Sequence, residues 1–127
     1  MPNTSEKSLY ERLGGYDAIA AVCDDLLERL LNDSQLKGYW RGHSQNSMRR
    51  ERQRLVDYIC EAAGGPVYYL GLDMKTSHTG LGISESDWEV MAGHLAATLE
   101  KFNVPEQEQQ AVFAFGASIK GDIVEQA

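Results

Sequence analysis

The apolar residues between Asp17 and Leu31 recur with the spacing of an α-helix. They lie three or four positions apart, which makes one face of a helix apolar and leaves the other face polar. The same period returns in three later segments, whereas the alternation typical of a half-buried strand is almost absent. The chain is therefore predicted to be all-α. In the first segment the pattern consists of Ile19, Val22, Cys23, Leu26, Leu27, Leu30 and Leu31.

Residues that start or stop a helix mark the boundaries of the next two segments. A helix over about 47–63 is predicted to end at Gly64-Gly65-Pro66, where glycine is followed by proline. A helix over 84–102 is predicted to start at Ser84, with Asp87 three positions later in an arrangement close to a capping box. Each of these helices would present one apolar face to the core.

A last long helix is expected over 105–124, because proline is favoured at the first helical position and Pro105 opens the segment. Shorter helical turns are expected at 9–13 and 35–40, followed by a polar loop at 41–46. The long helices form two predicted hairpins, and the two hairpins would pack as an α-helical sandwich. The pairs are 17–31 with 47–63 and 84–102 with 105–124.

Length and charge limit the possible classes of function. A chain of 127 residues suits one domain, expected over 8–127 after a disordered tail at 1–7. The net charge of −7 disfavours binding to a nucleic-acid backbone. No apolar run approaches the ~20 residues that span a bilayer, and the polar N-terminus lacks a signal core. We therefore expect a cytoplasmic protein without membrane contact, with Cys23 and Cys60 as buried thiols.

The segment between the two predicted hairpins, residues 66–83, has no long helical period and contains His78. A connection of this length in a small domain is usually functional or held in place by another group. Imidazole is the commonest protein ligand of metals, so His78 is a candidate ligand of a metal or cofactor. The alternative is a solvated loop histidine, which is the commoner case for this residue type in a loop.

Four arginines, among twelve positive charges in the chain, crowd the start of the helix expected at 47–63. They form either a solvated charged face or a site for an anion, since cations at a helix N-terminus oppose the helix dipole. Together with His78 they suggest a large apolar cofactor that carries carboxylates. Haem b has that character, because its iron takes an axial imidazole and its propionates take basic partners. The arginines are Arg49, Arg50, Arg52 and Arg54.

Five motifs occur in order over about residues 8–125, nearly the whole chain. They are Leu9-Tyr10-Glu11-Arg12-Leu13-Gly14-Gly15, Ala62-Ala63-Gly64-Gly65-Pro66, Met74-Lys75 before His78 with Gly80 and Ile83, Ala92-Gly93-His94-Leu95, and Asn103-Val104-Pro105. In this order and at these separations they resemble the group I truncated haemoglobins, short globins with a two-over-two helical sandwich around a haem. A double glycine alone is weak support, whereas the five motifs together are specific.

The resemblance implies that His78 is the proximal ligand of the haem iron, with an acceptor on its other ring nitrogen that fixes the tautomer. By the same resemblance, Tyr39 and Trp40 would form an aromatic pair that wedges the haem, and Arg50 and Arg54 would lie near the propionates. Met74 and Lys75 would lie beside the proximal edge, and Ile83 and Trp88 at the proximal wall. Tyr58 would pack on the distal face, and Met91 would line a ligand tunnel.

The distal side departs from the pattern of the family. Many relatives carry a tyrosine on the second helix and a glutamine on the third, and here these positions hold Leu27, Glu51 and Leu55. A hydrogen-bond donor stabilises oxygen in such a pocket by about 1–3 kcal/mol, and leucine supplies none. We expect Glu51 to turn toward solvent and the arginines, which leaves Tyr58 as a candidate donor. Oxygen should dissociate faster than from relatives with the tyrosine.

The resemblance implies a haem protein that binds O2, CO or NO and takes part in oxygen binding or transport. Oxidation of nitric oxide or a peroxidase-like activity would need a separate reductase, because the chain has no dinucleotide-binding motif. The alternative is a cofactor-free helical interaction module on a globin scaffold. A monomer or weak dimer is expected, with His43 as a candidate sixth ligand and His94 as a hydrogen-bonded structural residue.

Overall fold

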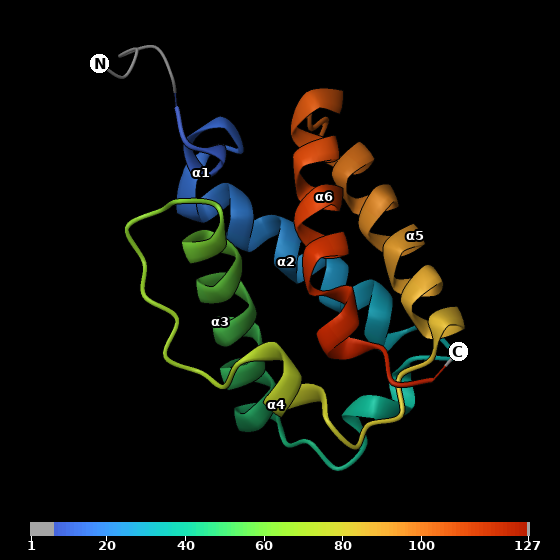
Figure 1. Cartoon of the computed structure of the whole chain (residues 1–127). Helices are drawn as coiled ribbons and strands as arrows, with labels where there is room; N and C mark the ends of the chain where they lie inside the picture. Colours follow the sequence, from blue (N-terminus) through green and yellow to red (C-terminus); the bar gives the residue numbers. More distant parts are fainter. Residues whose placement is uncertain (1–6, 127) are drawn as a thin grey trace.

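The computed structural model describes residues 7–126, so the tail expected at 1–7 lies, apart from Lys7, outside the described residues. Within that range the structure is helical and contains no strand, only an isolated bridge between Ser84 and Gln126. The prediction of an all-α fold is confirmed. The elements in Figure 1 are α1 (Leu9–Arg12), α2 (Gly15–Leu31), η1 (Lys37–Trp40), α3 (Gln45–Ala62), α4 (Met74–His78), α5 (Glu85–Lys101) and α6 (Glu106–Ile123).

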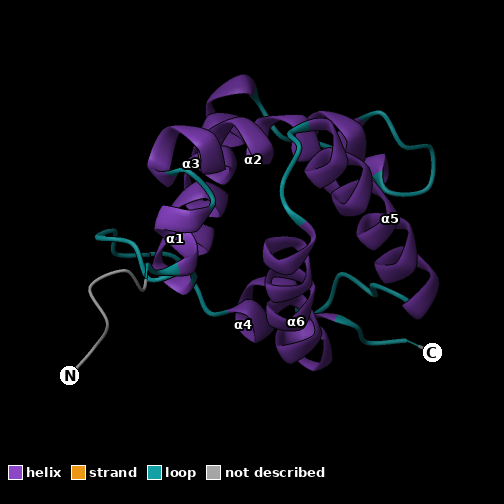
Figure 2. Cartoon of the chain, turned by 90° about the horizontal axis from the view of Figure 1, so that it is seen from above, coloured by secondary structure: helices purple, strands orange, loops and turns teal. Residues whose placement is uncertain are grey.

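The long helices pack as the two predicted hairpins. Helix α2 contacts α3, α5 contacts α6, and a further contact between α2 and α5 joins the two hairpins. Figure 1 and Figure 2 show α1 and α3 on one side of the molecule and α5 on the other, with α2 running from one side to the other and α4 beside α6. No helix in the described range is long and apolar enough to cross a membrane.

The helix boundaries differ from the predicted ones where a side chain or a tertiary contact decides them. Helix α3 begins at Gln45 rather than Ser47, because the Ser44 side chain accepts a hydrogen bond from the Ser47 amide and caps the helix earlier. The expected polar loop is correspondingly shorter. Pro105 is the N-cap of α6 and not its first helical residue. The segment 66–83 is not irregular throughout, because it includes α4.

The fully buried core lies mainly between α2 and α3. Ile19, Ala20 and Cys23 of α2 pack against Val56 and Cys60 of α3. Both cysteines are buried free thiols, as predicted. Burial, followed by the neighbouring Cys60 and Asp24, raises the pKa of Cys23 to about 12. Val67, from the connection before α4, packs against this cluster, whereas none of its five buried members lies on α4 itself.

The start of α5 is tied to η1 through one buried carboxylate. Ser84 and Asp87 form a complete capping box, as the sequence indicated. The Tyr39 hydroxyl donates a hydrogen bond of 2.5 Å to Oδ2 of Asp87, and the Gln35 amide donates one of 2.6 Å to Oδ1. These hydrogen bonds lower the pKa of Asp87 to about 2, Tyr39 contributing most. They hold Tyr39 against the start of α5.

Candidate functional site

His78 is the last residue of α4, and its ring orientation is set by its own helix. Nδ1 lies 2.8 Å from the carbonyl oxygen of Met74 and 2.9 Å from Oγ of Ser77. A carbonyl oxygen can only accept a hydrogen bond, so Nδ1 carries the ring proton. Nε2 then bears a lone pair, and among residues 7–126 it has no hydrogen-bond partner. This is the tautomer that a metal ligand requires, and the Met74 carbonyl is an acceptor of the kind that the resemblance implies.

The apolar and aromatic residues expected at the haem share one property, which is partial burial. All eight are half-buried, and none belongs to the fully buried core. A large apolar group can gain binding free energy by covering such surfaces. The donor nitrogen of His78 and these side chains therefore fit haem chemically. The eight are Tyr39, Trp40, Leu55, Tyr58, Met74, Ile83, Trp88 and Met91.

An aromatic cluster joins α3, α6 and the connection before α4. The ring of Tyr58 lies 5.1 Å from that of Tyr69, edge to face, and 5.8 Å from that of Phe115. The Tyr69 hydroxyl donates a hydrogen bond of 2.6 Å to the carbonyl oxygen of Leu72. Burial raises the pKa of Tyr58, so its hydroxyl keeps its proton and can act as a donor. Phe115 is not among the residues that the sequence predicted at the site, and nothing in its spacing marks this contact.

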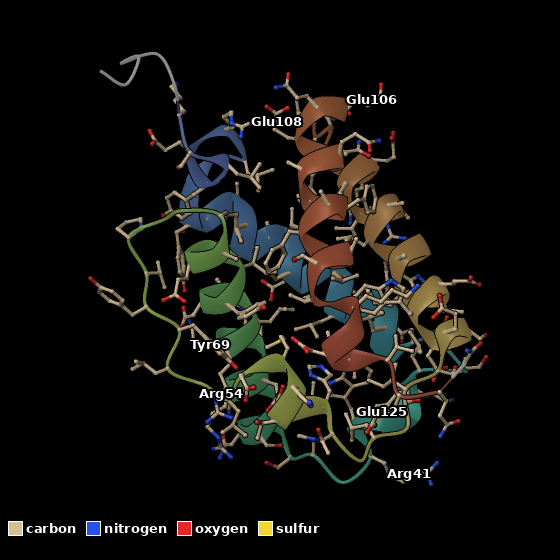
Figure 3. All side chains as sticks on the ribbon, viewed as in Figure 1. Arg41, Arg54, Tyr69, Glu106, Glu108 and Glu125 are labelled. Atoms are coloured by element: carbon tan, nitrogen blue, oxygen red, sulfur yellow. The ribbon has the colours of Figure 1, made fainter. Side chains whose placement is uncertain are left out.

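The basic residues at the start of α3 divide into two groups. Arg52 binds Oδ1 and Oδ2 of Asp24 at 2.8 and 3.1 Å, so it joins α3 to α2. Arg50 and Arg54 are exposed. Arg54 lies 3.8 Å from Glu51, in an exposed and therefore weak pair, and Figure 3 shows it at the end of the molecule where Arg41 is also labelled. Lys75 on α4 is exposed as well.

The predicted distal residues lie on α2 and α3 without forming a polar site. Glu51 turns toward Arg54 and solvent, as its charge led us to expect. Leu55 is half-buried on the same helix. Leu27 of α2 lines an open cleft of about 540 Å³ between α2 and α3, together with Leu31 and Met48. The roles of these residues toward a ligand stay predictions.

The other two histidines have different environments. Nε2 of His94 lies 2.7 Å from Oδ2 of Asp33, which ties α5 to the loop after α2 and confirms the predicted structural role. His43 is exposed before α3, with Nδ1 3.0 Å from Oγ of Ser47. Its role as a sixth ligand stays a prediction.

Comparison with known proteins agrees with this arrangement. A family model described as bacterial-like globin matches residues 8–124. The group 1 truncated hemoglobin GlbN of Mycolicibacterium paratuberculosis is 33% identical, over 91% of this chain and 83% of the relative. The group 1 truncated hemoglobin GlbN of a Synechocystis species is 30% identical, over 94% of this chain and 98% of the relative.

Solved structures show the same fold. The truncated hemoglobin of Tetrahymena pyriformis in its Fe(III) form superposes with a TM-score of 0.85, at 23% identity over 93% of this chain and 98% of that chain. The THB1 structure of Chlamydomonas reinhardtii gives a TM-score of 0.78, at 27% identity over 93% and 97%. The two hairpins, the motifs and the match of nearly the whole chain agree, and the protein belongs to the bacterial-like globin family as a group 1 truncated haemoglobin.

Proposed function

We propose that this globin holds haem b through Nε2 of His78. Globins carry haem and bind diatomic ligands, and this chain is a haem protein of that kind. When bound, haem supplies an iron centre that coordinates O2, CO or NO. The observation that supports His78 as the ligand is the 2.8 Å hydrogen bond between Nδ1 and the Met74 carbonyl, because it leaves Nε2 unprotonated.

The remaining predicted contacts divide into apolar packing and charge. Half-buried side chains of η1, α3, α4 and α5 would pack against the macrocycle, with Tyr58 already held by Tyr69 and Phe115. Arg50 and Arg54 would neutralise the propionates, and Lys75 would lie beside the proximal edge. Arg54 is free to exchange its partner, since its exposed pair with Glu51 at 3.8 Å contributes little to stability.

The distal residues favour ligands that need no hydrogen bond. Leu27 and Leu55 offer no donor, and the carboxylate of Glu51 points to Arg54. Tyr58 is the remaining donor of the proposed distal set, and its ring is held by two aromatic contacts. We therefore expect this protein to bind O2 less tightly, in comparison with CO and NO, than relatives with a distal tyrosine do.

Oxidation of nitric oxide or peroxidase-like turnover by this chain would draw electrons from a separate reductase, because the sequence has no dinucleotide-binding motif of its own. We place the protein in the cytoplasm, as a monomer or weak dimer with no nucleic-acid or membrane partner. The net charge of −7 supports the exclusion of nucleic acid.

The proposal is tested by optical spectra of the ferric, ferrous and carbonyl forms of the purified protein reconstituted with haem. We expect an intense Soret band that His78→Ala weakens and shifts. His94→Gln serves as the control, since His94 is bound to Asp33 and not assigned to haem. Wild-type protein that binds no haem would favour the interaction module, and His78→Ala protein with wild-type spectra would exclude His78 as the ligand.

A further inference from the structure

The chain directly after His78 is held by a carboxylate from the far end of the sequence. The Gly80 amide donates to Oε1 and Oε2 of Glu125, both at 3.1 Å, and the Gly82 amide donates to Oε1 at 2.9 Å. Both glycines have positive φ, 88° and 70°, a region that residues with a Cβ rarely adopt. These hydrogen bonds, that of Gly80 first, lower the pKa of Glu125.

The backbone of Glu125 is itself fixed against the segment before α5. Its amide donates a hydrogen bond of 2.8 Å to the carbonyl oxygen of Ile83, and the Glu85 amide donates one of 2.9 Å to that of Gln126. Ser84 and Gln126 form a parallel bridge, and Lys120 pairs with Glu85 beside it. The backbone that carries the Glu125 carboxylate is therefore held in place by hydrogen bonds. Figure 3 shows Glu125 just beyond the C-terminal end of α6.

Helix α4 needs such support because it has only five residues. An isolated helix of that length is unstable in water, because its few hydrogen bonds do not offset the unfavourable free energy of nucleation. Its N-cap, Asp73, makes no side-chain hydrogen bond to the helix. On the C-terminal side the turn from Thr79 to Gly82 connects α4 to the Glu125 carboxylate, and α4 packs along α6.

We propose that Glu125 is a positioning residue that fixes α4, and with it the imidazole of His78, through the amides of Gly80 and Gly82. This inference rests on the proposed role of His78 as the haem ligand. The orientation of the ring then depends on two constraints. The Met74 carbonyl sets the rotation of the ring, and Glu125 sets the place of the helix that carries it.

Two variants of Glu125 test the proposal, with Glu106→Gln as the matched control. Glu106 is an exposed glutamate at the opposite end of α6 (Figure 3). Glu125→Ala removes both acceptor oxygens. Glu125→Gln keeps an oxygen in the place of Oε1, which accepts from both amides, and removes the charge. Glu125→Gln also keeps the test informative if Glu125→Ala does not fold.

The first measurement is hydrogen exchange of the Gly80 and Gly82 amides in the haem-free protein. We expect Glu125→Ala to accelerate exchange by about tenfold or more, because each amide loses a hydrogen bond to a charged group. Glu125→Gln should fall between wild type and Glu125→Ala, and Glu106→Gln should match wild type. Unchanged exchange in Glu125→Ala would show that the carboxylate does not hold this turn.

The second measurement is the iron–histidine stretching band of the ferrous haem protein by resonance Raman spectroscopy. We expect the band to shift or broaden in Glu125→Ala and less in Glu125→Gln, since the ring is less well placed. Faster amide exchange with an unchanged band would overturn the positioning role while leaving His78 as the ligand. The spectra of His78→Ala decide the proposed function separately, because that test does not involve Glu125.

Discussion

The place of one proton determines whether His78 can bind a metal. A neutral imidazole has one nitrogen that donates and one that accepts. The Met74 carbonyl, 2.8 Å from Nδ1, can only accept, so it selects the tautomer with the lone pair on Nε2. Ser77, whose Oγ lies 2.9 Å from Nδ1, is the other neighbour of that nitrogen. The residue is thus prepared for coordination by an acceptor four positions earlier in its own helix.

Leu27→Tyr is expected to slow the dissociation of oxygen. The substitution restores a donor at the position where relatives carry tyrosine, and one hydrogen bond of about 1–3 kcal/mol corresponds to roughly a 5- to 150-fold change in rate. Stopped-flow displacement of oxygen by CO measures the rate. Leu31→Tyr is the control, because Leu31 lies one turn later on α2 and lines the same cleft. Equal rates in wild type and Leu27→Tyr would place Leu27 away from the ligand.

The two thiols are expected to be unreactive in the folded protein. Both cysteines are buried, and burial is the main cause of the raised pKa of each. Because the thiolate is the reactive form, a thiol-specific reagent such as DTNB should modify Cys23 and Cys60 only after unfolding. Modification is followed by absorbance in the presence and absence of urea. Rapid labelling without urea would contradict the packing of α2 against α3.

At the scale of elements, carboxylates with lowered pKa values join α2 and η1 to α5. Asp25 of α2 accepts hydrogen bonds from Thr98 and Lys101 of α5, at 2.7 and 2.8 Å, besides one from Arg29 of its own helix. These three donors, Arg29 first, hold the pKa of Asp25 well below its usual range. Hydrogen bonds, that of Tyr39 first, also lower the pKa of Asp87 at the other end of α5. We therefore expect protonation of these carboxylates in acid to weaken the contact between α2 and α5.

Asp87→Asn is expected to reduce the loss of stability in acid. The pKa of Asp87 is about 2 in the folded protein and 3.8 without its hydrogen bonds, so the unfolded chain binds the proton more tightly. Its contribution, about 2 kcal/mol, is present above roughly pH 4 and is lost as the pH falls toward 2. Urea unfolding at a series of pH values measures how steeply the free energy of unfolding changes with pH. Asp17→Asn, at an exposed position of α2, is the control, and equal slopes in wild type and Asp87→Asn would contradict the assignment.

The long helices were predictable because each carries its own apolar period and end signals. Helix α4 was not, because five residues show no period and their helix depends on contacts made elsewhere in the fold. The same distinction applies to the site. His78 is visible through the motif around it, whereas Glu125 reaches Gly80 across 45 positions through a backbone contact that leaves no pattern in the sequence. Phe115 reaches Tyr58 in a similar way.

At the scale of the whole molecule, the fully buried core is confined to a few places. Ten hydrophobic residues between Lys7 and Gln126 are buried, and five of them form the cluster between α2 and α3. Many large apolar residues of α3, α4 and α5 remain half-buried, among them Leu55, Met74 and Trp88. A bound haem would add its own apolar surface to theirs, so it would act as part of the core as well as a functional group.

Haem is therefore expected to raise the unfolding temperature of the wild-type protein, and to raise that of the His78→Ala variant by less. A ligand that binds only the folded state stabilises it by about 1.4 kcal/mol for each tenfold increase in free ligand above its dissociation constant. Loss of the bond between Nε2 of His78 and the iron weakens haem binding. It therefore reduces the rise in unfolding temperature at every haem concentration. Thermal unfolding followed by far-UV circular dichroism, over a series of haem concentrations, measures both proteins. An unfolding temperature that does not change with haem would mean that the half-buried residues of α3, α4 and α5 do not enclose it.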